Sequence, residues 1–115
     1  LGYMKKSEPY GTIDDPVERV KHLSGYSFPL HALPQIMDLA DAVRRDVGGF
    51  DTPILFIHAR DDTVTTLDGS KDLFEEITSP KEFVVLEQGD HIVFRDFDHK
   101  KAIDAVLRFR NSTAR

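Results

Sequence analysis

Apolar residues recur along the chain with two different spacings, and these predict alternating helices and strands. Between His31 and Val47 they stand three or four positions apart, which predicts one apolar stripe on a helix that Gly48-Gly49 ends. Ile54–Ile57 and Phe83–Leu86 are continuous apolar runs, typical of short buried strands. The stripe consists of Leu33, Ile36, Met37, Ala40, Val43 and Val47, and we expect Leu33, Ile36, Met37 and Ala40 to be ordinary core.

Further helices are predicted at 16–23, 67–77 and 98–109. Asp15 can cap the first of them, and Pro16 suits a first helical position. Residues 1–13 and 25–30 are rich in Gly, Pro and Tyr and are predicted to be loop and turn, and the tail from residue 111 is expected to fray. The last helix is expected to bury Ala102, Ile103, Val106, Leu107 and Phe109.

The order strand, helix, strand, helix from residue 53 onward is typical of a parallel α/β sheet. Two parallel strands do not make a core alone, because such sheets are covered on both faces and need flanking strands. We therefore expect the fold to be incomplete as it stands. The further strands would come from an N-terminal part preceding Leu1, which is not a start residue, or from a self-associating copy.

Composition narrows the classes of partner. The 15 basic and 20 acidic residues give a net charge of −5, and no basic run exceeds two residues, which disfavours nucleic acid. There is no cysteine, so disulfides and thiolate metal sites are excluded and a cytoplasmic location is predicted. The longest apolar runs are far too short for a transmembrane segment.

Polar residues follow both predicted strands. Asp61-Asp62 comes after the first strand and Asp90-His91 after the second. Since adjacent parallel strands end at the same edge of a sheet, these turns are expected to lie within side-chain reach of each other. A carboxylate beside an imidazole is the orienter and base of a nucleophilic triad, in which the acid fixes the tautomer of the histidine.

The two turns resemble those of α/β-hydrolases of the carboxylesterase and monoacylglycerol-lipase type. The segment from Ala59 to Val64 is similar to the pattern A-R-x-D-x-V/M, which implies that Asp62 is the triad acid, with Asp61 as the alternative. The segment from Glu87 to Ile92 is similar to the S-G-H turn, which implies that His91 is the base. The resemblance extends from Pro53 to Phe109.

This resemblance implies the C-terminal part of a serine carboxylesterase or lipase that needs no cofactor. Residues 1–50 would form a lid or cap-like helical segment with the helix after it, and residues 51–115 the βαβα part of the core. The expected substrate is a small ester or monoglyceride. The residues expected to border it are Val64, Ile92, Leu33 and Met37.

The sequence departs from the family pattern in two ways. The nucleophile signature G-x-S-x-G is absent, and the nearest segment, Gly25–Pro29, follows no predicted strand. We therefore expect the nucleophilic serine to lie outside these 115 residues and the fragment alone to be inactive. Asp90 stands before His91 where the family often has glycine.

Two alternatives stay open. The chain could be a hydrolase-derived binding or interaction module in which Asp62 and His91 no longer catalyse a reaction. His58, Asp61, Asp62 and His91 are also residue types that bind metals, although their spacing matches no familiar metal motif.

Overall fold

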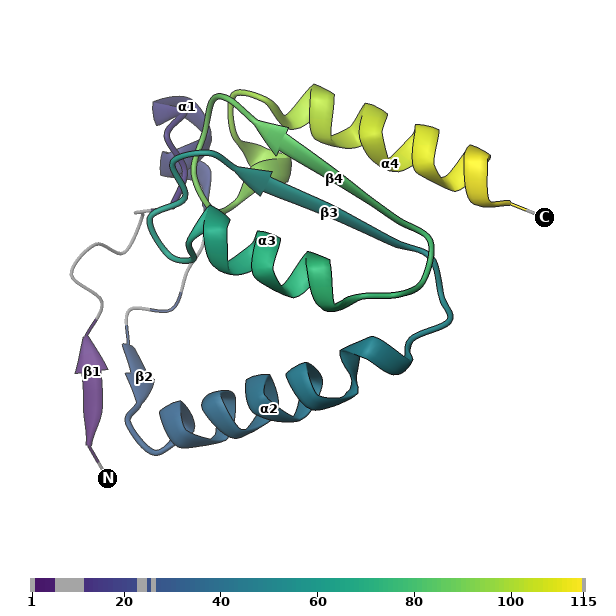
Figure 1. Ribbon diagram of the computed structural model, residues 1–115. Coiled ribbons are helices and arrows are strands. Elements are labelled where there is room, and N and C mark those ends of the chain that lie inside the picture. Colours follow the sequence, from purple (N-terminus) through teal and green to yellow (C-terminus); the bar gives the residue numbers. More distant parts are fainter. Residues whose placement is uncertain (1, 6–11, 23–24, 26, 115) are drawn as a thin grey trace.

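A computed structural model describes residues 2–5, 12–22, 25 and 27–114 (Figure 1). Its helices and strands follow the predicted order from residue 53 onward. The elements are β1 (Tyr3–Lys5), α1 (Pro16–Lys21), β2 (Ser27–Pro29), α2 (Ala32–Asp46), the 3-10 turn η1 (Val47–Gly49), β3 (Ile54–Ala59), α3 (Leu67–Glu76), β4 (Lys81–Leu86), the 3-10 turn η2 (Val93–Arg95) and α4 (His99–Thr113).

The centre of the fold is the parallel pair β3–β4, as predicted. Ile54 lies opposite Lys81 and Ala59 opposite Leu86, so the strands are in register over their whole length. In Figure 1 the pair lies between α3 and α4, and α3 is the crossover between the two strands. The chain therefore has the βαβα arrangement of an α/β fold.

Three aromatic side chains fix α3 on this pair. Phe56 of β3 and Phe83 of β4 stack with ring centroids 5.6 Å apart. Phe74 of α3 meets both rings edge-on, at 5.6 and 5.3 Å. The Lys81 ammonium lies 4.3 Å from the centre of the Phe74 ring, a cation–π contact.

Both long helices expose more apolar surface than their patterns predict. On α2 the stripe is buried only at its end, where Val47 begins η1; the other apolar side chains, among them Ile36 and Met37, are exposed. On α4, Ala102 and Ala105 are buried, while Ile103, Val106 and Leu107 are exposed. The prediction of a core stripe was thus wrong within the described residues, because the periodic pattern identifies an apolar face but not what covers it.

The predictions for the N-terminal segment were partly wrong. Asp15 caps α1 as expected, accepting hydrogen bonds from the backbone of Val17 and Glu18, and the helix ends at Lys21. The predicted loop and turn, however, contain β1 and β2, which pair antiparallel with Tyr3 opposite Pro29. Three-residue strands carry no periodic signal of their own, so only the pairing reveals them.

The predicted frayed tail is helical instead. α4 continues to Thr113, and the hydroxyls of Ser112 and Thr113 donate to the carbonyl of Phe109, three and four positions earlier, respectively. None of the helices in the described ranges is both long and apolar enough to cross a membrane.

Candidate active site

Two turns meet at the carboxyl ends of β3 and β4. The acid turn, residues 60–66, follows Ala59, and the histidine turn, residues 87–92, follows Leu86. Because Ala59 and Leu86 are register partners, the turns begin side by side, and the Arg60 N–H donates to the Leu86 carbonyl at 2.8 Å. The edge of the sheet that was expected to hold the polar residues therefore does hold them.

The structure brings Asp62 and His91 into direct contact. Asp62 Oδ2 lies 2.9 Å from His91 Nδ1. The carboxylate is shielded, with 4 % of its side chain exposed, whereas 37 % of the His91 side chain is exposed. The contact occupies Nδ1, and within the described ranges no hydrogen bond reaches Nε2, so the second ring nitrogen can serve a proton-transfer partner. Asp61, the alternative acid, is exposed and is not the carboxylate at His91.

The acid turn folds around the Asp62 carboxylate. Its Oδ1 accepts the backbone N–H groups of Val64 and Thr65, both at 2.8 Å, and Oδ2 also accepts the Thr65 hydroxyl at 3.1 Å. Burial raises the pKa of Asp62, but the hydrogen bonds from Thr65, His91 and Val64 outweigh it and lower the pKa to about 2. Asp62 is therefore ionised at neutral pH and available to stabilise a charged imidazole.

His58 is a buried second histidine on the other side of the acid. Its Nε2 lies 3.1 Å from the Thr65 carbonyl and 3.4 Å from Asp62 Oδ2, and Nδ1 lies 2.9 Å from the Ser70 hydroxyl. A carbonyl can only accept, so Nε2 carries a proton. His58 is thus a packed, hydrogen-bonded residue near the end of β3.

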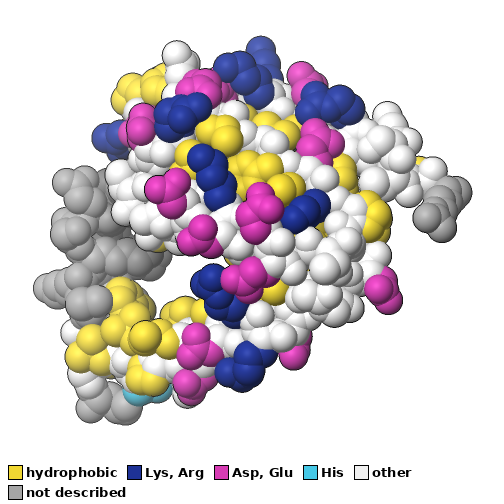
Figure 2. All heavy atoms as spheres, viewed as in Figure 1, with side chains coloured by type: hydrophobic (Ala, Val, Ile, Leu, Met, Phe, Trp, Pro, Cys, Tyr) yellow, Lys and Arg dark blue, Asp and Glu magenta, His cyan; other side chains and the backbone are white. Residues whose placement is uncertain are grey.

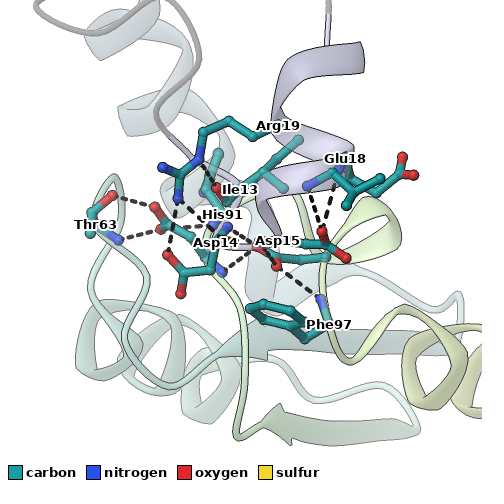
Figure 3. A network of polar contacts seen from close by, with 11 residues as sticks. Ile13, Asp14, Asp15, Glu18, Arg19, Thr63, His91 and Phe97 are labelled. Atoms are coloured by element: carbon teal, nitrogen blue, oxygen red, sulfur yellow. Dashed lines mark hydrogen bonds and ion pairs between the residues drawn. The ribbon is translucent and has the colours of Figure 1, made fainter.

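A network of carboxylates behind the histidine was not predicted (Figure 3). Asp90 Oδ1 accepts the N–H groups of Thr63 and His91, and Oδ2 accepts the Thr63 hydroxyl. Asp96, with 1 % of its surface exposed, accepts four backbone N–H groups. These four donors are Asp14, Asp15, Asp90 and Phe97. Burial raises the pKa of Asp96, but these hydrogen bonds outweigh it and hold the pKa below its ordinary value.

The only sequence signal for this network is Gly89, which follows β4 and directly precedes Asp90 in the histidine turn. Gly89 has φ of +114°, and a Cβ there would lie 2.9 Å from both Cβ and Cγ of Asp96. A residue with a side chain would thus be held in a strained backbone conformation, and its Cβ would collide with the buried carboxylate. The hydrogen-bond donors themselves are backbone groups, which no residue pattern identifies.

The residues expected to border a substrate are divided between two places. Val64 is exposed in the acid turn, and Ile92 directly follows His91, where its N–H donates to the Thr12 carbonyl. Leu33 and Met37 lie on α2, which Figure 1 shows well apart from the two turns. Figure 2 shows hydrophobic side chains gathered at the lower left, over the beginning of α2. Their binding role stays a prediction.

No described group of three or more His, Cys, Asp or Glu side chains is arranged to hold a metal ion, although His58, Asp62 and His91 are neighbours. At this edge of the sheet the Asp62 carboxylate instead contacts one imidazole nitrogen of His91. Chemically, such a pair can take a proton from a hydroxyl and return it to a leaving group.

Comparisons with known proteins agree with this fold. The family described as Serine aminopeptidase, S33, a hydrolase family, matches residues 17–98. A chain from a structural study of LipS and LipT, two metagenome-derived lipolytic enzymes, superposes with a TM-score of 0.80 at 19 % identity. The superposition covers 97 % of this chain and 44 % of the other, so residues 1–115 span less than half of that protein. No curated protein matches the sequence.

Proposed function

The chain belongs to the serine aminopeptidase S33 family of α/β-hydrolases, and from that membership we propose that it supplies the acid and the base of a serine carboxylesterase or lipase. The observation that carries the proposal is the 2.9 Å contact between a shielded Asp62 and a partly exposed His91. The fold shared with a lipolytic enzyme supports an ester as the substrate.

In the proposed reaction the nucleophile is a serine from outside residues 1–115. His91 accepts the serine proton at Nε2 as the oxygen attacks the ester carbonyl, and then gives that proton to the leaving alcohol. In the second half a water attacks the carbonyl of the acyl-enzyme while His91 takes its proton. His91 then returns that proton to the serine oxygen as its bond to the acyl group breaks, which releases the acid and regenerates the serine. Asp62 holds the ring through Nδ1 and stabilises the imidazolium formed in each half. No cofactor enters this scheme.

We further propose that residues 1–50 act as a lid or cap segment and residues 51–115 as part of the catalytic core. The support is the exposed apolar surface of α2, where 68 % of Met37 is exposed beside Leu33. Such a surface suits contact with an acyl chain, while Val64 and Ile92 border the reacting end of the substrate. A cytoplasmic location stays a prediction, based on the absence of cysteine.

The description of the family favours a second candidate, hydrolysis of an amino-terminal peptide bond. The same acid and base serve ester and amide cleavage, because both reactions pass through a tetrahedral intermediate. The leaving group and the pocket distinguish the two substrates, so a substrate comparison decides between them.

The test is hydrolysis of p-nitrophenyl esters and of amino-acid p-nitroanilides by the full-length protein. Asp62→Asn keeps the shape of the acid but removes its charge, and we expect kcat to fall by about 10³- to 10⁴-fold. His91→Ala is expected to lower kcat by at least as much. Asp61→Asn, in the same turn, is the matched control and is expected to keep wild-type kcat.

Three results would contradict the proposal. Faster cleavage of the anilides would favour the aminopeptidase candidate. A loss of kcat caused by Asp61→Asn rather than Asp62→Asn would identify Asp61 as the catalytic acid. If neither substrate class is cleaved, a non-catalytic binding module becomes the better explanation.

A further inference from the structure

We propose that Asp90 is a positioning residue, a clamp that holds the acid turn and the histidine turn at the distance that the Asp62–His91 contact requires. The inference rests on the proposed function for its catalytic consequence. Its structural part stands on the contacts of Asp90 alone.

Asp90 joins the two turns through a single carboxylate. Oδ1 accepts the Thr63 N–H at 2.7 Å and the His91 N–H at 2.8 Å, and Oδ2 accepts the Thr63 hydroxyl at 2.7 Å. Thr63 directly follows the acid Asp62, and His91 is the base. The His91 bond lies within the histidine turn, whereas the two Thr63 bonds cross to the acid turn. A shift of one turn against the other must therefore break the bonds between Thr63 and the buried Asp90 carboxylate.

These contacts also keep Asp90 from competing with Asp62. Asp90 is adjacent to His91 in the chain, and a free carboxylate there could bind the imidazole itself. Both of its oxygens are instead engaged by Thr63 and the His91 backbone, in charge-assisted bonds that are stronger than neutral ones. The His91 ring is thus left to Asp62.

Asp90 is itself held in place by Asp96. Its own N–H donates to Asp96 Oδ2 at 2.8 Å, and Asp96 is anchored by three further backbone donors. Gly89 permits this approach, since any Cβ there would collide with the Asp96 carboxylate. Figure 3 shows the resulting chain of contacts from Thr63 across the histidine turn to the segment before α1.

The clamp depends on two adjacent residues of the histidine turn. Here Gly89 and Asp90 together supply the backbone freedom and the carboxylate.

The decisive experiment compares Asp90→Ala with Thr63→Val in the full-length protein. Asp90→Ala removes all three hydrogen bonds; Thr63→Val removes only the one from the hydroxyl and keeps the side-chain shape. Asp61→Ala, an exposed acid one residue before Asp62, controls for the loss of negative charge. The readouts are the downfield proton NMR signal of His91 Nδ1–H, and kcat and KM for a p-nitrophenyl ester.

We expect Asp90→Ala to broaden or abolish the Nδ1–H signal and to lower kcat by about 10- to 100-fold while KM stays within about twofold, because a small displacement of a catalytic group is this costly. Thr63→Val is expected to weaken the signal and to lower kcat by less than about tenfold, in line with loss of one of three contacts. Asp61→Ala is expected to change neither. A purely structural role would lower the melting temperature without a selective loss in kcat.

A wild-type signal and wild-type kcat in folded Asp90→Ala would overturn the proposal. If Asp90→Ala does not fold, an unchanged Nδ1–H signal in Thr63→Val would overturn it instead. The two proposals also fail separately. If the wild-type protein cleaves no ester but Asp90→Ala still abolishes the signal, the clamp stands and the proposed function does not.

Discussion

Asp62 and Asp96 each accept four hydrogen bonds while remaining almost out of contact with water. Asp62 binds two backbone N–H groups, a hydroxyl and an imidazole, and Asp96 binds backbone N–H groups only. Burial disfavours the ionised form of both, yet the donors more than compensate, so the pKa of each lies below its ordinary value. These residues are therefore sites where folding and protonation are linked.

The first prediction at this scale concerns the stability of the protein at low pH. The pKa of Asp62 falls from 3.8 to about 2 on folding, so its contribution is complete above pH 3.8 and is lost as the pH falls through about 2. The shift corresponds to about 2 kcal/mol of unfolding free energy. In urea unfolding at pH 6, 4, 3 and 2, the stability difference between wild type and Asp62→Asn is expected to shrink by that amount between pH 4 and 2. A difference that stays constant with pH would show that Asp62 is not a stabilising carboxylate.

The second prediction concerns Gly89. Alanine there must adopt φ of +114° and place its Cβ 2.9 Å from the Asp96 side chain. We expect Gly89→Ala to lower the free energy of unfolding by roughly 2–3 kcal/mol, as backbone strain and a buried collision do elsewhere. Gly49→Ala is the matched control, because a Cβ at Gly49 meets nothing within 4 Å. Equal unfolding free energies for the two variants would contradict the strained geometry.

At the scale of elements, α2 and α3 use their apolar faces differently. α3 sets Phe74 against two aromatic rings of the sheet, so its amphipathic pattern is satisfied within the chain. α2 is the longer helix, but its apolar side chains Leu33, Ile36 and Met37 are exposed, and only η1 after it supplies a buried valine. The exposed face of α2 is therefore available to the substrate or to protein outside residues 1–115.

The prediction for α2 separates stability from substrate binding. Met37→Ala removes an exposed side chain and is expected to change the unfolding free energy by less than about 0.5 kcal/mol. If α2 contacts the acyl chain, the same change raises KM for octanoyl but not acetyl p-nitrophenyl esters, by several-fold, with kcat unchanged. Val20→Ala, an equally exposed apolar change on α1, serves as the control. Equal KM values for both chain lengths would remove Met37 from the acyl site.

At the scale of the whole molecule, the sequence predicts the features that follow from the local order of residues along the chain. The pattern of β3, α3, β4 and α4 follows from apolar runs and stripes, and the meeting of Asp62 with His91 follows because parallel strands end at one edge. The β1–β2 pairing and the Asp90 clamp depend instead on backbone groups brought together by folding. The exposed faces of α2 and α4 were missed because periodicity does not reveal which surfaces are covered.

The reach of Asp96 along the chain has a consequence for the order of folding. Its bonds to Asp14 and Asp15 span 82 and 81 residues, whereas β3 and β4 are joined through a single short helix. Closing the longer loop costs more chain entropy, so the β3–α3–β4 unit is expected to assemble first and the segment before α1 to dock last. Contacts formed after the rate-limiting step slow unfolding without accelerating folding. Asp96 would then act as a kinetic latch, which lengthens the lifetime of the native state while leaving the speed of its formation almost unchanged.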